Sequence, residues 1–331
     1  MLKFTIMRIP KLLLAAIAVT AFFSFQSCKK NNDVTVPDPT PVIKPDTLTT
    51  GWTKVVLAGE TGFGDIFFNS STTGYLTGSK IYKSTDGGNT WLPVLTNSNL
   101  FNIFMTNDNK AFFVGQASAV LKTVDGGVNF IPFNMSATVY DIYFADNSIG
   151  FFIAQDGLYN TTDGGVTWVK LVTTGLPLAV SYSTLSFVNN TTGWVLVNGI
   201  IYKTNGSNLN WQQAIVNGGS GNSTFVSVYA VSASTIYATN YSGQVFRSTD
   251  GGANFSLLKQ LDAVGFADVH FITDLIGYVS IGRNVYKTID GGTNWTKVVS
   301  LGQGTLGELH FTDANHGWVC GDGGVVLVFK P

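Results

Sequence analysis

Variants of the segment Ser84-Thr85-Asp86-Gly87-Gly88-Asn89-Thr90-Trp91 return along most of the chain. Four further copies keep the acid and the glycine pair, at 123–130, 161–168, 248–255 and 288–295. A degenerate copy at 204–211 has Gly206 where the acid would stand. Successive copies are 39, 38, 43, 44 and 40 residues apart. A nearly constant period of this length indicates a repeat architecture.

Each copy lies in the same context of short apolar segments. Ile81-Tyr82-Lys83 precedes the first copy, and residues 92–95 follow it. Two further segments of this kind, 65–68 and 74–77, lie upstream and are separated by turn residues. This pattern predicts four short strands per unit. Four strands in about 40 residues is the period of a β-propeller blade.

The two ends of the repeated region complement each other. Trp52-Thr53-Lys54-Val55-Val56 repeats the segment 295–299, so residues 51–57 are predicted to be an outer strand. Three further strands are predicted at 308–311, 317–320 and 325–329. Together these segments complete one blade and leave no open seam in the ring. We therefore predict an all-β fold over residues 51–331, a seven-bladed β-propeller of four-stranded blades in which an N-terminal strand completes the C-terminal blade.

The pattern S-x-D-x-G-x-T-W, which residues 84–91 match at every fixed position, resembles the Asp-box (BNR) repeat. That repeat occurs in sialidases, sortilin-type receptors, xyloglucanases and the photosystem II assembly-factor propellers. The layout of the whole chain looks most like the assembly-factor type. The resemblance implies that the boxes lie at the outer rim, away from the ligand face. Their acids are therefore predicted to be structural, and they are Asp86, Asp125, Asp163, Asp250 and Asp290.

The first 50 residues are predicted to lie outside the propeller. Three basic residues precede an apolar run over 12–25, which is typical of a secretory signal and too short for a membrane-spanning helix. The end of this run resembles the lipobox of bacterial lipoproteins, which implies removal of residues 1–27 and lipidation of Cys28. Residues 28–50 are polar and Pro-rich, so we expect an extended tether. The alternative is a cleaved signal with an incidental cysteine.

The composition argues against several classes of partner and site. The chain has 19 basic and 20 acidic residues and no Lys/Arg stripe, so we expect no nucleic-acid binding. We expect no cofactor and no metal, because no phosphate-binding loop and no zinc spacing of Cys and His is present. Cys320 is predicted to be a buried core thiol. We expect a monomer that contacts the membrane only through its lipid.

Enzymes with this fold need residues that are scarce here. A sialidase holds its substrate carboxylate with three arginines, and only Arg247 and Arg283 remain once the signal is removed. The Arg-rich patch that the assembly-factor resemblance implies is missing for the same reason. A glycoside hydrolase needs two carboxylates about 5–10 Å apart. The only glutamates are Glu60 and Glu308, but a pair of aspartates stays open.

A polar residue leads the first strand of every unit. In chain order these residues are Asp65, Asn102, Asp141, Thr184, Ser227, Asp268 and Glu308. Two positions further on the residues are mostly aromatic, and they include His270 and His310. Since the first strand of a blade lines the central channel, these acids and histidines form a candidate axial ligand ring for a cation, a sugar or a peptide. The alternative is that the acids bind neighbouring backbone N–H groups and that the rings pack between blades.

These observations favour a non-enzymatic binding or assembly module that recognises a protein partner or a surface glycan. A lipid at Cys28 would hold it in the cell envelope, at the outer membrane or cell surface rather than at the inner membrane. The alternative is a polysaccharide-active glycoside hydrolase or lyase that uses aspartates at the propeller axis. A purely structural surface component is a third interpretation.

Overall fold

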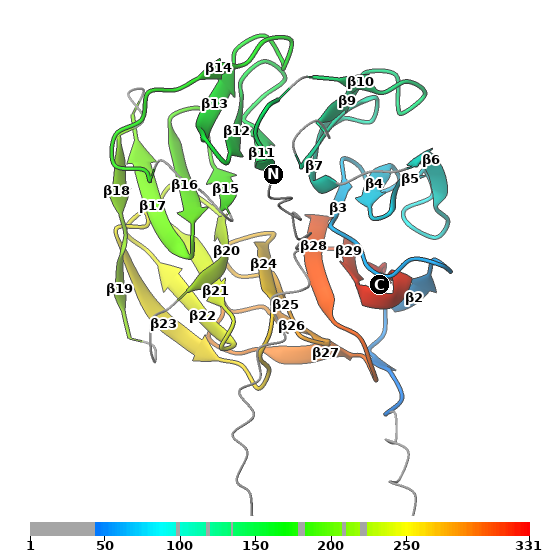
Figure 1. The fold of residues 1–331 in the computed structure, drawn as a ribbon. Helices are drawn as coiled ribbons and strands as arrows, with labels where there is room; N and C mark the ends of the chain where they lie inside the picture. Colours follow the sequence, from blue (N-terminus) through cyan, green and yellow to red (C-terminus); the bar gives the residue numbers. More distant parts are fainter. Residues whose placement is uncertain are drawn as a thin grey trace, which may run out of the picture. The chain divides into compact units, whose positions relative to one another are not determined.

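Seven β-sheets follow one another around a ring in residues Pro45–Pro331 (Figure 1). The computed structural model describes residues 44–96, 100–116, 120–133, 135–177, 183–206, 210–218 and 224–331. The predicted signal peptide, Cys28 and the predicted tether up to residue 43 lie outside the described residues. In the described part of the chain, no helix is long and apolar enough to cross a membrane.

In blades 1 to 4 the strands run outward from the axis in chain order. Blade 1 holds β3 (Asp65–Phe68), β4 (Gly74–Thr77), β5 (Lys80–Ser84) and β6 (Leu92–Thr96); blade 2 holds β7 (Leu100–Asn107), β8 (Lys110–Gly115), β9 (Leu121–Thr123) and β10 (Ile131–Pro132). Blade 3 holds β11 (Val139–Phe144), β12 (Gly150–Ala154), β13 (Gly157–Thr161) and β14 (Val169–Lys170); blade 4 holds β15 (Ser183–Phe187), β16 (Thr192–Val197), β17 (Ile200–Asn205) and β18 (Trp211–Gln213).

Two of the remaining blades carry a fifth, outermost strand. Blade 5 holds β20 (Phe225–Ala230), β21 (Ile236–Asn240), β22 (Gln244–Ser248), β23 (Asn254–Gln260) and β19 (Ile215–Asn217). Blade 6 holds β24 (Ala267–Phe271), β25 (Gly277–Ile281), β26 (Asn284–Thr288), β27 (Thr296–Ser300) and β1 (Thr47–Leu48). Blade 7 holds β28 (Leu306–Asp313), β29 (His316–Gly321), β30 (Val325–Phe329) and β2 (Trp52–Val56), with a short 3₁₀ turn, η2 (Asp322–Gly324), before β30.

Both ends of the ring meet in blade 7. β2 pairs antiparallel with β30 over its whole length, from Trp52 opposite Phe329 to Val56 opposite Val325. Innermost strand β28 lies against β24 of blade 6 on one side and β3 of blade 1 on the other. Figure 1 shows the blue strand β2 beside the red C-terminal strands. The predicted seven-bladed propeller, closed by an N-terminal strand in the C-terminal blade, is confirmed.

The outer edges of blades 4 to 6 are each covered, at least in part, by another segment of the chain. Strand β1 pairs antiparallel with β27, so pairing begins at residue 47, four residues before the predicted start at residue 51. Strand β19 runs parallel to β23, and Thr174 forms a parallel bridge with Asn210 beside β18. The sequence pattern did not predict these additions, because segments of one to three residues have no periodicity to read.

Neighbouring blades lock together through aromatic rings. Phe68 ends the first strand of blade 1 and stacks on Trp318 of blade 7, with centroids 3.6 Å apart. Gly74 faces Phe68 across the blade, and a Cβ at this glycine would lie 2.4 Å from the ring. The same Phe–Gly pair recurs in blades 3, 4, 6 and 7. In blade 2 the ring is replaced by Met105, and Ala111 stands in the glycine position. The phenylalanine ring therefore explains why the facing position is a glycine.

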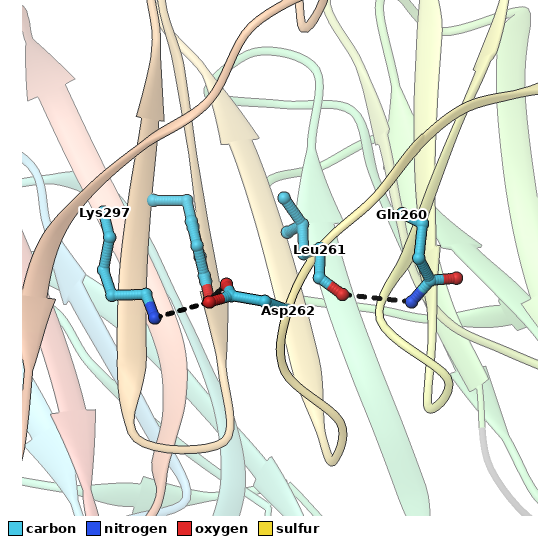
Figure 2. A network of polar contacts seen from close by, with 5 residues as sticks. Gln260, Leu261, Asp262 and Lys297 are labelled. Atoms are coloured by element: carbon cyan, nitrogen blue, oxygen red, sulfur yellow. Dashed lines mark hydrogen bonds and ion pairs between the residues drawn. The ribbon is translucent and has the colours of Figure 1, made fainter.

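Polar contacts tie the connections between blades to the sheets. At the end of blade 5, Gln260 Nε2 donates to the carbonyl of Leu261 at 3.0 Å (Figure 2). The next residue, Asp262, accepts hydrogen bonds from Tyr286 Oη and from Lys297 Nζ, the latter at 2.9 Å. These two donors lower the pKa of Asp262. Two other blades repeat the pairing of a third-strand tyrosine with a loop acid, in Tyr82–Glu60 and Tyr159–Asp156.

Candidate functional site

The carboxylate of each Asp box is bound within its own turn. Asp86 Oδ1 accepts from Ser84 Oγ at 2.9 Å and from the Thr90 N–H at 3.0 Å, while Oδ2 accepts from Thr90 Oγ1 at 2.6 Å. Gly87 has φ +72°, a region that glycine enters without strain. The other four boxes repeat this geometry, at Asp125, Asp163, Asp250 and Asp290. These hydrogen bonds support the predicted structural role of the box acids.

The boxes also join adjacent blades. In three blades the basic residue immediately before the box donates to a backbone carbonyl in the box of the following blade. Lys330 makes the same contact from the corresponding position after β30. The observed pairs are Lys83 with Gly126, Lys122 with Gly165, Arg247 with Gly291 and Lys330 with Asp86. Asn160 holds the equivalent position in blade 3, and the blade that follows it has the degenerate box with Gly206. In the sequence, a basic residue before most boxes is the signal for these contacts.

At the axis, aspartates join the innermost strands of neighbouring blades. Asp65 Oδ1 accepts from the N–H of Ile66 in its own strand at 2.7 Å. Its Oδ2 accepts from the N–H of Ile103 in blade 2 at 2.8 Å. The same arrangement is found at Asp141, with Ile142 and Leu185, and at Asp268, with Val269 and Leu309. Each of these three carboxylates therefore acts as a clamp between two blades.

The clamps explain why acids do not lead every first strand. One carboxylate has two oxygens and therefore satisfies the N–H groups of two successive blades. The blades after Asp65 and Asp141 need no acid, and they carry Asn102 and Thr184. Ser227 donates its hydroxyl to Asp268 Oδ1 at 2.7 Å. Glu308 falls outside this alternation, because the N–H of the residue that follows it is already bound by Asp268.

The two axial histidines lie side by side, with ring centroids 5.5 Å apart. His310 Nε2 lies 2.9 Å from the carbonyl oxygen of Phe68, and His270 Nε2 lies 3.3 Å from Tyr229 Oη. Burial lowers the pKa of His270 and lowers that of His310 to about 4, so both rings are neutral at pH 7. Among the described residues, no three His, Cys, Asp or Glu side chains gather where they could hold a metal ion.

Aromatic rings continue around the axis from these histidines. Neighbouring centroids are 4.2 to 5.4 Å apart in the pairs His310–Phe67, Phe67–Phe104, Phe104–Tyr143 and Tyr229–His270. Ser186 interrupts the arc, and its hydroxyl accepts from the N–H of Ala230. The structure thus brings the predicted axial residues together, and the three clamp aspartates are bound to backbone N–H groups. Cys320 is a buried free thiol, as predicted.

Two hollows lie away from the axis. The first, about 140 Å³, lies between blades 3 and 4 on a floor of Ile153, Leu158, Leu171, Leu176 and Val197. Asp156 and Lys170 also line it and form an ion pair of 2.9 Å. The second, about 300 Å³, lies at the rim of blade 5 around Arg247 and Asp250. The sequence pattern predicted neither hollow. The first depends on packing between blades 3 and 4, and the second on how side chains of residues 247–258 are arranged across one hairpin.

Comparisons with known proteins agree with this fold. The family model described as "Photosynthesis system II assembly factor YCF48" matches residues 129–256. No curated protein matches the sequence. The chain is similar to the solved structure of YCF48 bound to a D1 peptide, with a TM-score of 0.71, 18% identity and coverage of 87% of this chain and 99% of that one.

Two further structures help to place the chain. YCF48 from Cyanidioschyzon merolae has a TM-score of 0.69 and 20% identity over 85% of this chain and 99% of its own. The GH74 xyloglucanase from Xanthomonas campestris has a TM-score of 0.55 and 14% identity over 82% of this chain and 43% of its own. Identities this low establish the fold alone. The chain is thus a seven-bladed Asp-box β-propeller that resembles the photosystem II assembly-factor type, as its sequence predicts.

Proposed function

We propose that this chain is a non-enzymatic binding module that recognises a segment of a protein partner. The observation that carries this proposal is the hydrogen bonding of the axial carboxylates. Asp65, Asp141 and Asp268 each accept backbone N–H groups from two blades. Hydrolysis of a glycosidic bond needs two carboxylates that flank a substrate. Carboxylates that hold the wall of the channel together are poorly placed for that chemistry.

The side chains that remain available for contact favour a protein partner. Four valines at the rim of blades 2 and 3 are exposed to solvent, namely Val128, Val166, Val169 and Val172. Exposed aliphatic side chains can serve as contacts in a protein interface. The similar layout of YCF48, whose structure was solved with a D1 peptide, supports this class of partner.

The proposal includes the cellular location that the N-terminal sequence predicts. Lipidation of Cys28 would hold the propeller at the outer membrane or cell surface, and the Pro-rich segment between Cys28 and strand β1 would act as a spacer. Replacing the thiol in Cys28→Ser removes the lipid acceptor. We expect the wild-type protein in the membrane fraction of its native cell and the variant in the soluble fraction. Equal membrane retention of both would contradict a lipid anchor.

Crosslinking in the native cell, followed by co-purification of the full chain, tests the proposed function. We expect one protein partner in a stoichiometric amount, crosslinked at a defined face of the propeller. Glycan carried along without a protein partner would contradict the proposal and favour glycan recognition. Cleavage of that glycan, abolished by Asp141→Asn in a folded variant, would instead establish the hydrolase or lyase interpretation.

A further inference from the structure

We propose that the outer edge of blade 3 is the docking site for an extended apolar segment of the partner protein. The segment would add to β14 as a fifth strand and place one apolar side chain in the neighbouring hollow. This inference rests on the proposed function, because it names the surface and the kind of segment that the binding module would use.

The outer edges of the blades differ in their ability to accept a strand. Blades 4 to 6 are already covered by the chain itself at Thr174, β19 and β1. Outermost strands β6 and β10 contain Pro93 and Pro132, and proline cannot donate to a sheet. Among the fourth strands of the blades, only β2 and β14 in the described residues have neither a proline nor a covering segment. The three covered edges show that extended segments fit beside these outer strands.

Strand β14 is distinguished by what surrounds it. The N–H of Leu171 donates inward to the carbonyl of Leu158 at 2.8 Å. Since alternate residues of a strand direct their backbone groups to opposite sides, those of Lys170 face away from the sheet. Val172 is 94% exposed and Val169 is 62% exposed. An added strand would therefore find backbone groups and aliphatic side chains together.

The hollow beside β14 fits one side chain of the added segment. Its volume of about 140 Å³ is well below the range of about 300–1,000 Å³ typical of small-molecule sites. The floor is apolar, and it includes Leu158, Leu171 and Val197. A buried apolar anchor in such a pocket is the usual centre of a protein interface. Because Lys170 and Asp156 neutralise each other at the edge, the site favours an uncharged apolar segment over a charged one.

A peptide selection on the full-length protein tests this site. A phage-displayed library of random twelve-residue peptides is selected on the wild type, and the best binder is synthesised with a fluorescent label. Its affinity is then measured by anisotropy for the wild type, for Val172→Asp and for the matched control Val264→Asp. Val264 is 73% exposed and lies in the connection between blades 5 and 6. A copy of the peptide N-methylated at alternate residues tests for backbone pairing.

We expect an apolar, β-branched peptide whose affinity falls at least tenfold in Val172→Asp and stays within twofold in Val264→Asp. N-methylation should weaken binding at least tenfold. Both valines are exposed, so equal melting temperatures should confirm that the variants fold. Peptides that bind Val172→Asp as tightly as the wild type would overturn this site and leave the proposed function standing. Failure to enrich any peptide above background would count against both.

Discussion

Aspartates at the rim and at the axis of this propeller both accept hydrogen bonds, but their donors lie at different separations along the chain. Asp86 at the rim accepts hydrogen bonds from residues at most four positions away. Asp65 at the axis accepts one bond from its neighbour in sequence and one from Ile103, 38 residues away. A rim carboxylate therefore shapes one turn, whereas an axial carboxylate joins two blades.

The comparison shows that identical residues in a repeat can have unequal importance for stability. Asp65 is 7% exposed, so water cannot replace its hydrogen bonds. The Thr90 N–H that Asp86 binds is exposed, and water can replace the lost acceptor there. We therefore expect axial substitutions to affect folding more than rim substitutions.

The largest effect is expected for Asp65→Ala, which leaves two backbone N–H groups at the axis without acceptors. Each unsatisfied buried group costs about 1–3 kcal/mol, so we expect a loss of about 3 kcal/mol in the free energy of unfolding. Urea denaturation measures this loss. Asp65→Asn keeps one acceptor oxygen and should lose about half as much. A loss below about 1 kcal/mol in Asp65→Ala would contradict the clamp.

Adding an acid at the axis should also destabilise the propeller. In Asn102→Asp the new carboxylate finds the N–H of Ile103 already bound to Asp65 and that of Ile142 bound to Asp141. We expect a loss of about 1–2 kcal/mol at pH 7, because a poorly partnered charge is partly buried. The loss should shrink at low pH, where the new carboxyl is protonated. Unchanged or higher stability would contradict the explanation of the alternation.

The axial histidines predict a pH dependence of stability. Burial lowers the pKa of His310 to about 4, whereas an unfolded histidine titrates near 6.5. Between these values the unfolded chain binds a proton that the folded chain does not, so stability falls as the pH drops from about 6.5 to 4. His310→Gln should reduce this dependence of stability on pH. Part of the dependence should remain, because the pKa of His270 is also lowered by burial. Denaturation midpoints from pH 4 to 7 measure the slope, and an unchanged slope in the variant would count against a neutral His310.

A smaller effect is expected for a box acid at the rim. Asp86→Ala removes three acceptor contacts inside one turn, but water reaches the freed donors. We expect a loss of about 1 kcal/mol by urea denaturation, clearly less than for Asp65→Ala. Amide exchange at Thr90 should become faster while exchange at Ile103 stays slow. An equal loss of unfolding free energy in Asp86→Ala and Asp65→Ala would contradict the greater importance of the axial aspartates for stability.

The smallest effect is expected for the exposed ion pair in the connection between blades 5 and 6. Lys297→Met removes the cation that binds Asp262 (Figure 2). The hydrogen bond from Tyr286 to Asp262 stays in place. Exposed ion pairs contribute about 0–1 kcal/mol, so the melting temperature should change by little. The stabilisation should also weaken at high salt in the wild type. A loss comparable to that of Asp65→Ala would show that the connections, not the axis, hold the blades.

The sequence predicted the fold well, because an eight-residue motif marks the same turn in successive blades. Repetition of Trp52-Thr53-Lys54-Val55-Val56 at 295–299 also revealed the composite blade. It predicted which polar residues reach the axis, but left open whether they bind a ligand or backbone N–H groups. Whether an axial carboxylate reaches the N–H groups of a neighbouring blade depends on the distance between the innermost strands of the two blades. The added strands and the hollow beside β14 were not predictable for the same reason, since they arise from contacts between distant segments.

One measurement tests most directly whether the axis holds the blades and the rim of blade 3 binds the partner. The affinity of the selected peptide and the melting temperature are measured together for Asp141→Asn and Val172→Asp. We expect Asp141→Asn to lower the melting temperature and leave the affinity of the folded protein within twofold. Val172→Asp should leave the melting temperature unchanged and weaken binding at least tenfold. The reverse pattern, with binding lost in folded Asp141→Asn and kept in Val172→Asp, would contradict this division and return the binding site to the axis.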